Sequence, residues 1–386
     1  MSSKQFLSEY WQKKPLLIRQ ALPNYQCPVD SGDLAGLAME EQVESRLILN
    51  HGKIGQWESR NGPFTEEDFN TLPEENCTFL VQQLDAWVPE INDLKQFFQF
   101  IPNWRFDDIM ASYATNGGSV GPHYDQYDVF IIQAQGTRRW RLGQRCNHLT
   151  PQLEDTSLRI IKDFEESENW LLEPGDMIYI PPYVAHYGVA EGESINLSVG
   201  YKAPTHTQII SHFTDHVLEQ VDPHQIYEDP DLEPQDNPGE ISKQALHKIK
   251  SAIEQLSKNP DQLERWLGEY STQAKNDCCI EPLEYEMTTD DIKELIEGNV
   301  TLYTNEGSRF AYSLNSENKI LFFVDGRSHE LDSEQKNLQK MNLEFVQTLC
   351  KMRPASINHL LPDSTSSQIL NIVLDLLHKG SLYFET

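Results

Sequence analysis

The stretch GPHYDQYDVFIIQAQGTRRW, residues 121–140, decides the fold of the region around it. It opens with a His and an Asp two positions apart and ends with two arginines inside an apolar run. Apolar runs on both sides of a glycine predict buried or half-buried β-strands. Charged side chains inside such strands need an explanation, because an unpaired buried charge is costly.

Further strand patterns surround this stretch, between about residues 108 and 204. They are short, follow period 2 and are separated by turn segments such as NGGSVGP, QGT and EPGD. Many short strands at this spacing are typical of a β-sandwich or barrel. The clearest predicted strands are DIMASYA, DVFIIQAQ, RRWRL, DMIYI and SINLSVGY.

The chain is too long for one typical domain, at 386 residues. Helical and short strand patterns mix through the first hundred residues, from FLSEYW and KPLLIRQ onward. Helical periodicity follows the strand-rich region, interrupted by the acidic linker YEDPDLEPQDNPGE, and a later helix and hairpin suggest a winged helix. We expect an α+β multidomain chain with domains at residues 1–204, 205–275 and 276–386.

Composition restricts the partners and the compartment. A formal net charge of −29 argues against a broad nucleic-acid-binding face and suits a basic partner, although many acidic proteins are simply soluble. Acidic residues also outnumber basic ones in the last hundred residues, so we expect no direct DNA binding. The absence of membrane-length apolar runs, of a signal-like N-terminus and of a cysteine framework predicts a cytoplasmic protein without membrane contact.

Three residues form a candidate metal site. His123 and Asp125 project from the same face of an extended chain, and His186 follows the predicted strand DMIYI and the Pro181-Pro182 pair. Two imidazoles and one carboxylate make a facial triad, which suits non-haem Fe(II) and leaves coordination positions open. A His-x-Asp pair alone is common by chance, so the strand-rich context and the distal His are the stronger observations.

Strand alternation makes an independent prediction about Arg138. Arg138, Trp140 and Leu142 fall on one face of their strand, and Arg139 and Arg141 fall on the other. The face with Trp and Leu should be interior, so Arg138 should point inward and need an anion. A dicarboxylate co-substrate would supply one, and an internal ion pair with Asp or Glu is the alternative.

The same reasoning applied to SINLSVGY places Asn196 and Ser198 opposite the apolar face, toward a polar cavity or toward solvent. Two other groups have simpler explanations. His212 and His216 lie four apart on a predicted helix without an evident third ligand, and the adjacent Cys278 and Cys279 form no usual chelate by themselves. The acidic residues that could receive a cationic side chain, or equally serve in loops and caps, are Asp107, Asp108 and Asp128.

These motifs carry a family resemblance. GPHYD, the Arg fifteen residues after His123, and PPYVAH resemble the metal and 2-oxoglutarate motifs of JmjC-type oxygenases, although many relatives carry Lys in place of Arg138. Within that family the chain resembles the bacterial ribosomal oxygenases through YWQKKPLLIR, GPHYDQYDVFIIQ, LEPGDMIYIPP and NLSVGY. The resemblance covers essentially the whole chain and is weaker beyond residue 204. Tyr124 is a departure, since close relatives usually have an aliphatic residue there.

The resemblance implies a double-stranded β-helix core of the jelly-roll or cupin type, a helical dimerisation region and a winged-helix-like C-terminal domain. It implies that His123, Asp125 and His186 bind Fe(II), and that O2 and 2-oxoglutarate are co-substrates. Arg138 matches the residue that binds the distal carboxylate of 2-oxoglutarate, and Asn196 and Ser198 match positions nearby.

The resemblance also implies a substrate. The relatives it points to are homodimers that hydroxylate an arginine in the sixteenth protein of the large ribosomal subunit. Three alternatives stay open: a ribosomal-protein histidine hydroxylase with the same motifs, a histone-type lysine demethylase, and a non-enzymatic cupin-like binding module. The last need not keep all four charged groups that this chain has.

Overall fold

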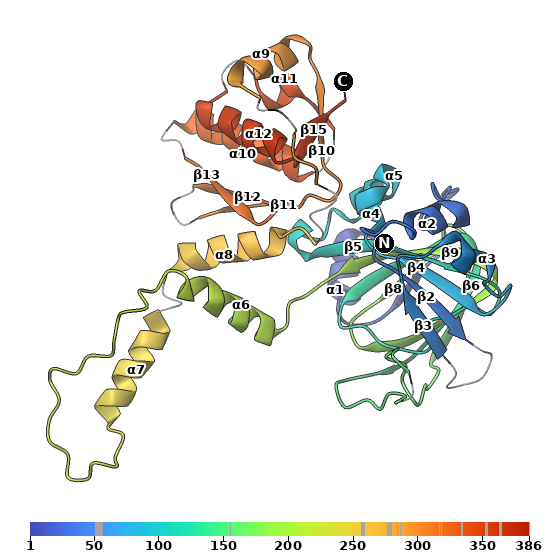
Figure 1. Ribbon diagram of the computed structural model, residues 1–386, viewed down its shortest axis with the longest axis horizontal. Coiled ribbons are helices and arrows are strands. Elements are labelled where there is room, and N and C mark those ends of the chain that lie inside the picture. Colours follow the sequence, from blue (N-terminus) through green and yellow to red (C-terminus); the bar gives the residue numbers. More distant parts are fainter. Residues whose placement is uncertain are drawn as a thin grey trace. The chain divides into compact units, whose positions relative to one another are not determined.

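The computed structural model describes residues 1–50, 57–154, 156–255, 259–275, 280–283, 285, 287–315, 317, 319–332, 335–351, 354–362 and 365–385. The predicted thiol pair Cys278 and Cys279 lies outside these residues. The chain divides into two compact units, one made mainly of Met1–Ala203 and the other of Pro204–Lys275 with most of the residues after Pro282 (Figure 1).

The first unit is built on a nine-stranded sheet with the order β1-β8-β6-β9-β5-β4-β2-β3, in which β7 also pairs with β6. Helices α1 (Ser3–Glu9), α2 (Ser31–Leu37), α3 (Glu66–Asn70), α4 (Leu84–Trp87) and α5 (Pro89–Asn92) accompany it. The strands are β1 (Leu16–Ile18), β2 (Ser45–Asn50), β3 (Trp57–Asn61), β4 (Cys77–Val81), β5 (Phe106–Ala114), β6 (Asp128–Arg145), β7 (Glu168–Leu172), β8 (Met177–Ile180) and β9 (Val184–Tyr201).

Two long strands, β6 and β9, form the centre of this sheet. They pair antiparallel from Asp128 opposite Tyr201 to Arg145 opposite Val184. On its other side β6 changes partner along its length, since residues 129–132 pair with β8 and residues 138–142 pair with β7. A bent strand that changes partner in this way curls the sheet into the predicted jelly roll.

The bend in β6 lies at Gly136, where the sequence analysis placed a turn between two strands. The structure instead has one continuous strand whose register against β9 shifts between Gln133 and Thr137. Gly136 has a φ of +63°, and a Cβ there would lie 1.9 Å from the carbonyl oxygen of Glu193. The glycine therefore forms a β-bulge that bends the strand without ending it.

His186 follows β8 and the Pro181-Pro182 pair, as predicted, and it also lies inside the next strand, β9. Pro181-Pro182 and Tyr183, whose φ is +66°, make a turn so short that β9 begins at Val184. The sheet also extends further toward the N-terminus than predicted. β5 begins at Phe106, and β2 and β4 belong to the same sheet.

Asp128 connects the N-terminal segment to the roll. It is fully buried and accepts hydrogen bonds from the Tyr179 hydroxyl at 2.6 Å and the Gln12 amide at 2.9 Å, and Arg105 lies 3.3 Å away. Burial raises the pKa of Asp128, although these three partners oppose the shift. Asp128 is thus a structural residue. Because it is buried and its carboxylate already has protein partners, it cannot receive a substrate side chain.

The second unit combines helices with two small sheets. The predicted hairpin forms as β11 and β12 and gains a third strand, β13. α8 lies in the range expected for the helical region, yet it packs so closely on this sheet that a Cβ at Gly268 would lie 2.3 Å from the Phe323 ring. The elements are α6 (His206–Leu218), α7 (Lys243–Gln255), α8 (Pro260–Thr272), α9 (Thr289–Glu297), β10 (Thr301–Thr304), β11 (Phe310–Leu314), β12 (Ile320–Val324), β13 (Arg327–Leu331), α10 (Lys336–Cys350), β14 (Ala355–Ser356), α11 (Ile357–Leu360), α12 (Ser367–His378) and β15 (Leu382–Phe384).

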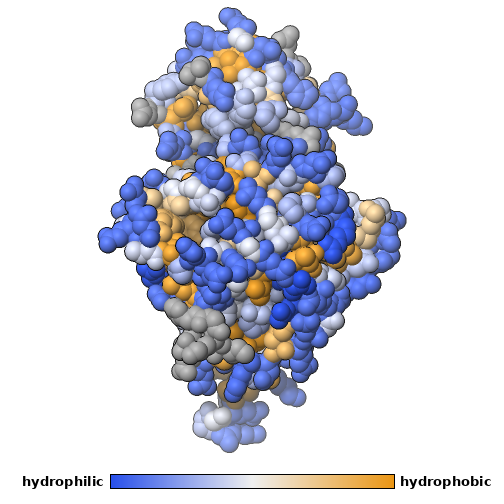
Figure 2. All heavy atoms as spheres, turned by 90° about the vertical axis from the view of Figure 1, so that its right-hand side faces the viewer, coloured by the Kyte–Doolittle hydropathy of each residue, from blue (hydrophilic) through white to orange (hydrophobic). Residues whose placement is uncertain are grey.

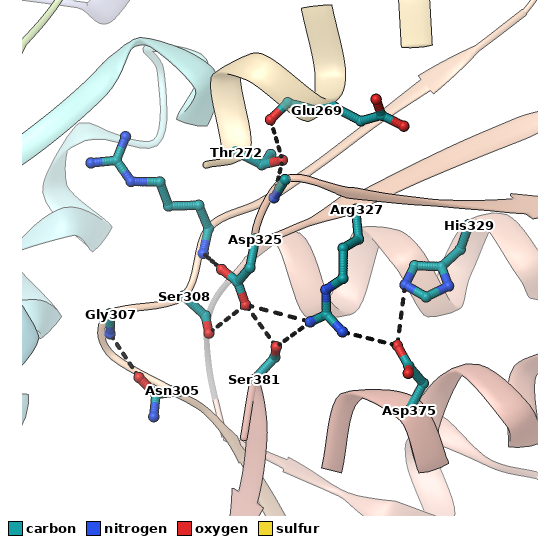
Figure 3. Close-up of polar contacts among 12 residues, drawn as sticks. Glu269, Thr272, Asn305, Gly307, Ser308, Asp325, Arg327, His329, Asp375 and Ser381 are labelled. Carbon is teal, nitrogen blue, oxygen red and sulfur yellow. Dashed lines mark hydrogen bonds and ion pairs between the residues drawn. The ribbon is translucent and has the colours of Figure 1, made fainter. Parts of the chain in front are cut away.

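A polar network around Asp325 joins the parts of this unit (Figure 3). Asp325 sits at the turn between β12 and β13 and accepts hydrogen bonds from the hydroxyls of Ser308 and Ser381. Arg327 continues the network by donating to Ser381 and to Asp375 of α12. Because neighbouring protein groups satisfy these side chains, we interpret the network as structural.

The surface agrees with the charge of the chain. Hydrophilic residues predominate on the face drawn in Figure 2, with small hydrophobic areas between them. Among the described residues, no helix is long and apolar enough to cross a membrane.

The bulge at Gly136 predicts the cost of adding a side chain. Gly136→Ala should destabilise the protein by roughly 2–4 kcal/mol, since it combines a strained backbone with a clash against Glu193. Gly192→Ala is the matched control, because Gly192 has a φ of +83° but nothing within 4 Å of its added Cβ. It should cost about 1 kcal/mol. Equal shifts in urea denaturation would show that close packing at the bulge is unimportant.

Candidate functional site

The two histidines of the predicted triad are joined through their backbones. The His123 amide donates to the His186 carbonyl at 3.0 Å, and the His186 amide donates to the His123 carbonyl at 2.8 Å. This isolated antiparallel bridge places the imidazole centroids 4.2 Å apart. Residues 63 positions apart in the sequence are therefore fixed side by side by main-chain hydrogen bonds.

Asp125 completes the cluster. One of its carboxylate oxygens lies 3.9 Å from His123 Nε2 and 3.4 Å from His186 Nε2. The turn before β9 holds the Asp125 backbone, because the Tyr183 amide donates to the Asp125 carbonyl at 2.7 Å. The three side chains each offer one ligand atom, and these atoms all lie within 4.8 Å of one another.

Hydrogen bonds at the far side of each ring favour one tautomer. His123 Nδ1 lies 2.9 Å from the Gly121 carbonyl oxygen, and His186 Nδ1 lies 3.0 Å from the Val184 carbonyl oxygen. A carbonyl can only accept, so each Nδ1 carries a proton and each Nε2 keeps its lone pair. Both lone pairs are then available to a cation beside Asp125.

The protonation states also suit a metal. Burial, reinforced by the proximity of His186, lowers the pKa of His123 and keeps this ring neutral. Burial by itself would raise the pKa of Asp125, but the proximity of His186 and His123 holds it below its usual value. A neutral imidazole and a carboxylate are the forms of His and Asp that bind a divalent cation.

A cavity of about 470 Å³ opens beside the triad. The interior faces of β2, β4, β5, β6 and β9 line it, together with residues 157–159 from the segment between β6 and β7. It is large enough for a small co-substrate and part of a second molecule.

Arg138 lies inside this cavity, as strand alternation predicts, with only 4% of its surface exposed. Its guanidinium donates to the Ser112 hydroxyl at 2.9 Å and to the Ser194 hydroxyl at 3.0 Å. No described carboxylate lies within ion-pair distance of it. Burial lowers the pKa of Arg138 to about 9, so it remains charged at neutral pH.

Arg139 and Arg141, on the same strand as Arg138, each have a carboxylate partner. Arg139 pairs with Glu191 at 2.5 Å, and Arg141 lies 3.5 Å from Glu166. Both are partly exposed on the other face of β6. An ion pair with Asp or Glu was the alternative explanation for Arg138. Arg139 and Arg141 each have such a pair, but Arg138 has none among the described residues.

Asn196 and Ser198 also face the cavity, from β9. Asn196 is fully buried and donates to the Gln133 side-chain oxygen at 3.0 Å, while its own Oδ1 has no partner. The Trp140 Nε1 is another buried atom without a partner in the cavity wall. Unpaired buried polar atoms are uncommon and indicate that this cavity receives a polar ligand or water.

Two serines of the site were missed by the sequence analysis. Ser112 and Ser194 supply the hydrogen bonds to Arg138, and both face the interior. Alternation could have found Ser194, which has the parity of Asn196 and Ser198. The same reasoning on DIMASYA places Ser112 opposite its apolar face.

Four predicted residues remain to be placed: Asp107, Asp108, His212 and His216. Tyr127 lines the cavity, and its pKa is raised by the charge of Asp125, by burial, and by the charges of Asp108 and Asp107. Neither of these two acids is among the described residues that line the cavity. His212 lies elsewhere, on α6, where its ring contacts Tyr270 at 5.0 Å between centroids. His216, also on α6, has its Nε2 3.2 Å from Gln220, so these histidines do not join the triad.

Comparison with known proteins identifies two domains in the chain. A JmjC domain is recognised at residues 93–209, and a ROXA-like winged helix at residues 252–383. The ribosomal protein uL16 3-hydroxylase of Escherichia coli strain K12 is 36% identical over 304 residues, which cover 79% of this chain and 80% of that protein. A probable ribosomal oxygenase of Haemophilus influenzae is 44% identical over 206 residues, covering 53% of this chain and 50% of that one.

Solved structures extend the similarity to the whole chain. The X-ray structure of E. coli YcfD has a TM-score of 0.88 at 31% identity, covering 100% of this chain and 98% of that chain. YcfD, described as a ribosomal oxygenase, has also been solved in complex with cobalt and 2-oxoglutarate, with a TM-score of 0.86, 31% identity and coverage of 100% and 99%. The chain is thus similar over nearly its full length to solved structures of a ribosomal oxygenase, and it belongs to the JmjC-type ribosomal oxygenase family.

Proposed function

We propose that this protein is an Fe(II)- and 2-oxoglutarate-dependent hydroxylase of a ribosomal protein, acting on an arginine of the sixteenth large-subunit protein. The observation that carries the proposal is one cavity with two unlike ends. One end has His123, Asp125 and His186 with both Nε2 lone pairs available. The other has a buried guanidinium without a carboxylate partner among the described residues.

Each residue has a proposed role. His123, Asp125 and His186 hold the iron, because neutral imidazoles and a carboxylate are ligands of a facial triad. Arg138 binds the distal carboxylate of 2-oxoglutarate, since a guanidinium pairs well with a carboxylate and its serine partners are uncharged. Asn196 and Ser198 supply further polar contacts near that co-substrate.

The protein groups bind and orient rather than react. Arg138 fixes one end of 2-oxoglutarate, so that its other end faces the triad, and the apolar walls exclude water. When bound, the iron supplies the oxidising chemistry by which one oxygen atom of O2 enters a C–H bond and the other oxidises 2-oxoglutarate to succinate and CO2. The cobalt and 2-oxoglutarate complex of YcfD supports this use of the cavity.

The proposed target rests on charge and similarity. The negative charges of Asp107 and Asp108 act on Tyr127, which lines the cavity, and they would attract a guanidinium. The relative with the uL16 3-hydroxylase name is 36% identical to this chain, whereas a bifunctional lysine-specific demethylase and histidyl-hydroxylase of Aedes aegypti is 25% identical over 237 residues, covering 56% of this chain and 35% of that protein. We therefore favour arginine over histidine, and we propose that the enzyme acts in the cytoplasm, without direct contact with DNA or a membrane.

We further propose a homodimer formed through the helical region. Leu246, Ile249 and Ile253 follow helical spacing along α7, and 48–63% of each residue is exposed. A stripe of exposed aliphatic residues is unfavourable in water, and a second copy of the helix would cover it. No residue of α7 is buried within the chain.

The register of β6 predicts unequal effects for two adjacent arginines. Arg138→Ala should weaken 2-oxoglutarate binding strongly, by about 3–5 kcal/mol, because the distal carboxylate loses its charged partner inside the cavity. Arg139→Ala should have a small effect, since Arg139 pairs with Glu191 on the other face. Titration of 2-oxoglutarate into each cobalt-loaded variant measures this. Equal losses would contradict the assignment.

The substrate is tested by mass spectrometry of ribosomal proteins from cells with and without the gene. We expect an added oxygen on one arginine of the sixteenth large-subunit protein. A peptide spanning that arginine should be oxidised by the wild-type enzyme and not by His123→Ala, and more slowly as salt rises. Arginine→Lys in the peptide should lower turnover strongly, since lysine lacks the planar fork. An added oxygen on histidine alone would overturn the target and leave the iron chemistry standing.

The dimer is tested by light scattering of the purified protein. Ile249→Glu combined with Ile253→Glu should convert a dimer to a monomer, because charges would replace the apolar stripe. Lys250→Glu changes a residue on the same helix that is already solvated, with 71% of its side chain exposed, and should leave the mass unchanged. A wild-type monomer at micromolar concentration would refute the proposal.

A further inference from the structure

The cavity holds a second arginine whose charge the proposed co-substrate does not use. Arg46 of β2 is half-buried and lines the cavity, and no side-chain hydrogen bond or ion pair involves it among the described residues. Its neighbours in the wall are the apolar Ile48 and Leu80 and the uncharged Gln82. A guanidinium in such surroundings loses water when a ligand enters and then needs an oxygen acceptor.

Strand register shows where Arg46 points. Arg46 lies opposite Leu80, Leu80 lies opposite Ser112, and Ser112 lies opposite Asn196. Directly opposed residues in an antiparallel sheet share a face, so Arg46 projects to the same side as Ser112 and Asn196. Its backbone is two strands beyond Ser112, or roughly 10 Å at the usual strand spacing. Since Ser112 contacts Arg138, Arg46 lies further along the wall than the proposed 2-oxoglutarate anchor.

The charge distribution makes this arrangement unusual. The chain has 60 acidic residues and 31 basic ones, so an unpaired arginine is not explained by a shortage of carboxylates. Elsewhere in the first unit, carboxylates pair with Arg19, Arg60, Arg105, Arg139 and Arg141. Among described arginines of the cavity wall, Arg46, Arg138 and Arg159 have no carboxylate within ion-pair distance.

We propose that Arg46 is a specificity-determining residue that binds an oxygen acceptor of the protein substrate, beside the target residue. The acceptor is a main-chain carbonyl or a carboxylate of the substrate segment that enters the cavity. Arg159, exposed at the rim on the segment between β6 and β7, assists as a second and weaker donor. Together the two cations repel a further basic side chain, so they fix which part of a basic segment enters. This inference rests on the proposed function.

The test measures binding of the fluorescent target peptide to enzyme loaded with cobalt and 2-oxoglutarate, by anisotropy and without turnover. Arg46→Ala should weaken peptide binding about tenfold, as expected for losing a charged hydrogen bond. Arg46→Lys should recover only part of the loss, because lysine lacks the fork of donors. Arg145→Ala is the matched control, since Arg145 is an exposed arginine of β6 outside the cavity, and it should bind as wild type.

Two further measurements separate the outcomes. Affinity for 2-oxoglutarate should change less than twofold in Arg46→Ala, and an equal loss of both ligands would overturn the inference by assigning Arg46 to the co-substrate. Peptide binding like that of wild type in Arg46→Ala, or an equal loss in Arg145→Ala, would also overturn it. A peptide with Gln and Asn in place of its acidic residues identifies the acceptor. If Arg46→Ala still weakens binding of this peptide, the acceptor is a main-chain carbonyl. If Arg46→Ala no longer weakens it, the acceptor is a carboxylate. If wild type fails to bind any ribosomal peptide, the proposed function fails first and this inference with it.

Discussion

Two main-chain hydrogen bonds between His123 and His186 are the constraint on which the site depends. They join the segment before β6 to the start of β9, and thereby fix both imidazoles without using either ring. The rings are then free to donate through Nδ1 to local carbonyls and to present Nε2 to the cavity. A metal site built this way needs the roll to be closed, because its ligands come from two chain segments that meet only in the folded unit.

The same sheet also keeps Arg138 charged in the interior without a carboxylate partner among the described residues. A carboxylate partner would neutralise Arg138 and occupy the donors that a dicarboxylate ligand needs. Ser112 and Ser194 avoid this, since hydroxyl groups satisfy part of the guanidinium without cancelling its charge. The unpaired atoms Asn196 Oδ1 and Trp140 Nε1 in the same wall show that the site is incomplete in hydrogen bonding until a ligand enters.

Local patterns predicted much of this arrangement and failed where a tertiary contact decides. Period 2 placed Arg138 on an interior face and Asn196 opposite an apolar face, because alternation is a local property of any strand. It left open whether Asn196 faces a cavity or solvent. It could not show that Gly136 bends a strand rather than ending it, since that depends on the approach of Glu193 from β9. Nor could it place Asp128, whose partners Gln12 and Tyr179 are far away in the sequence.

The acidic residues and the cavity arginines act on a substrate over different distances. The excess of acidic residues produces a long-range field that attracts a basic protein, and salt screens that field. Inside the cavity the relation is reversed, because Arg46 and Arg138 offer donors at short range, where little water remains to screen them. An acidic exterior alone would accept any basic segment in any position. Cations at fixed points of the wall add the geometric requirement that an oxygen acceptor stand at a set distance from the reacting side chain, and that requirement is what can distinguish one arginine from its neighbours in a basic loop.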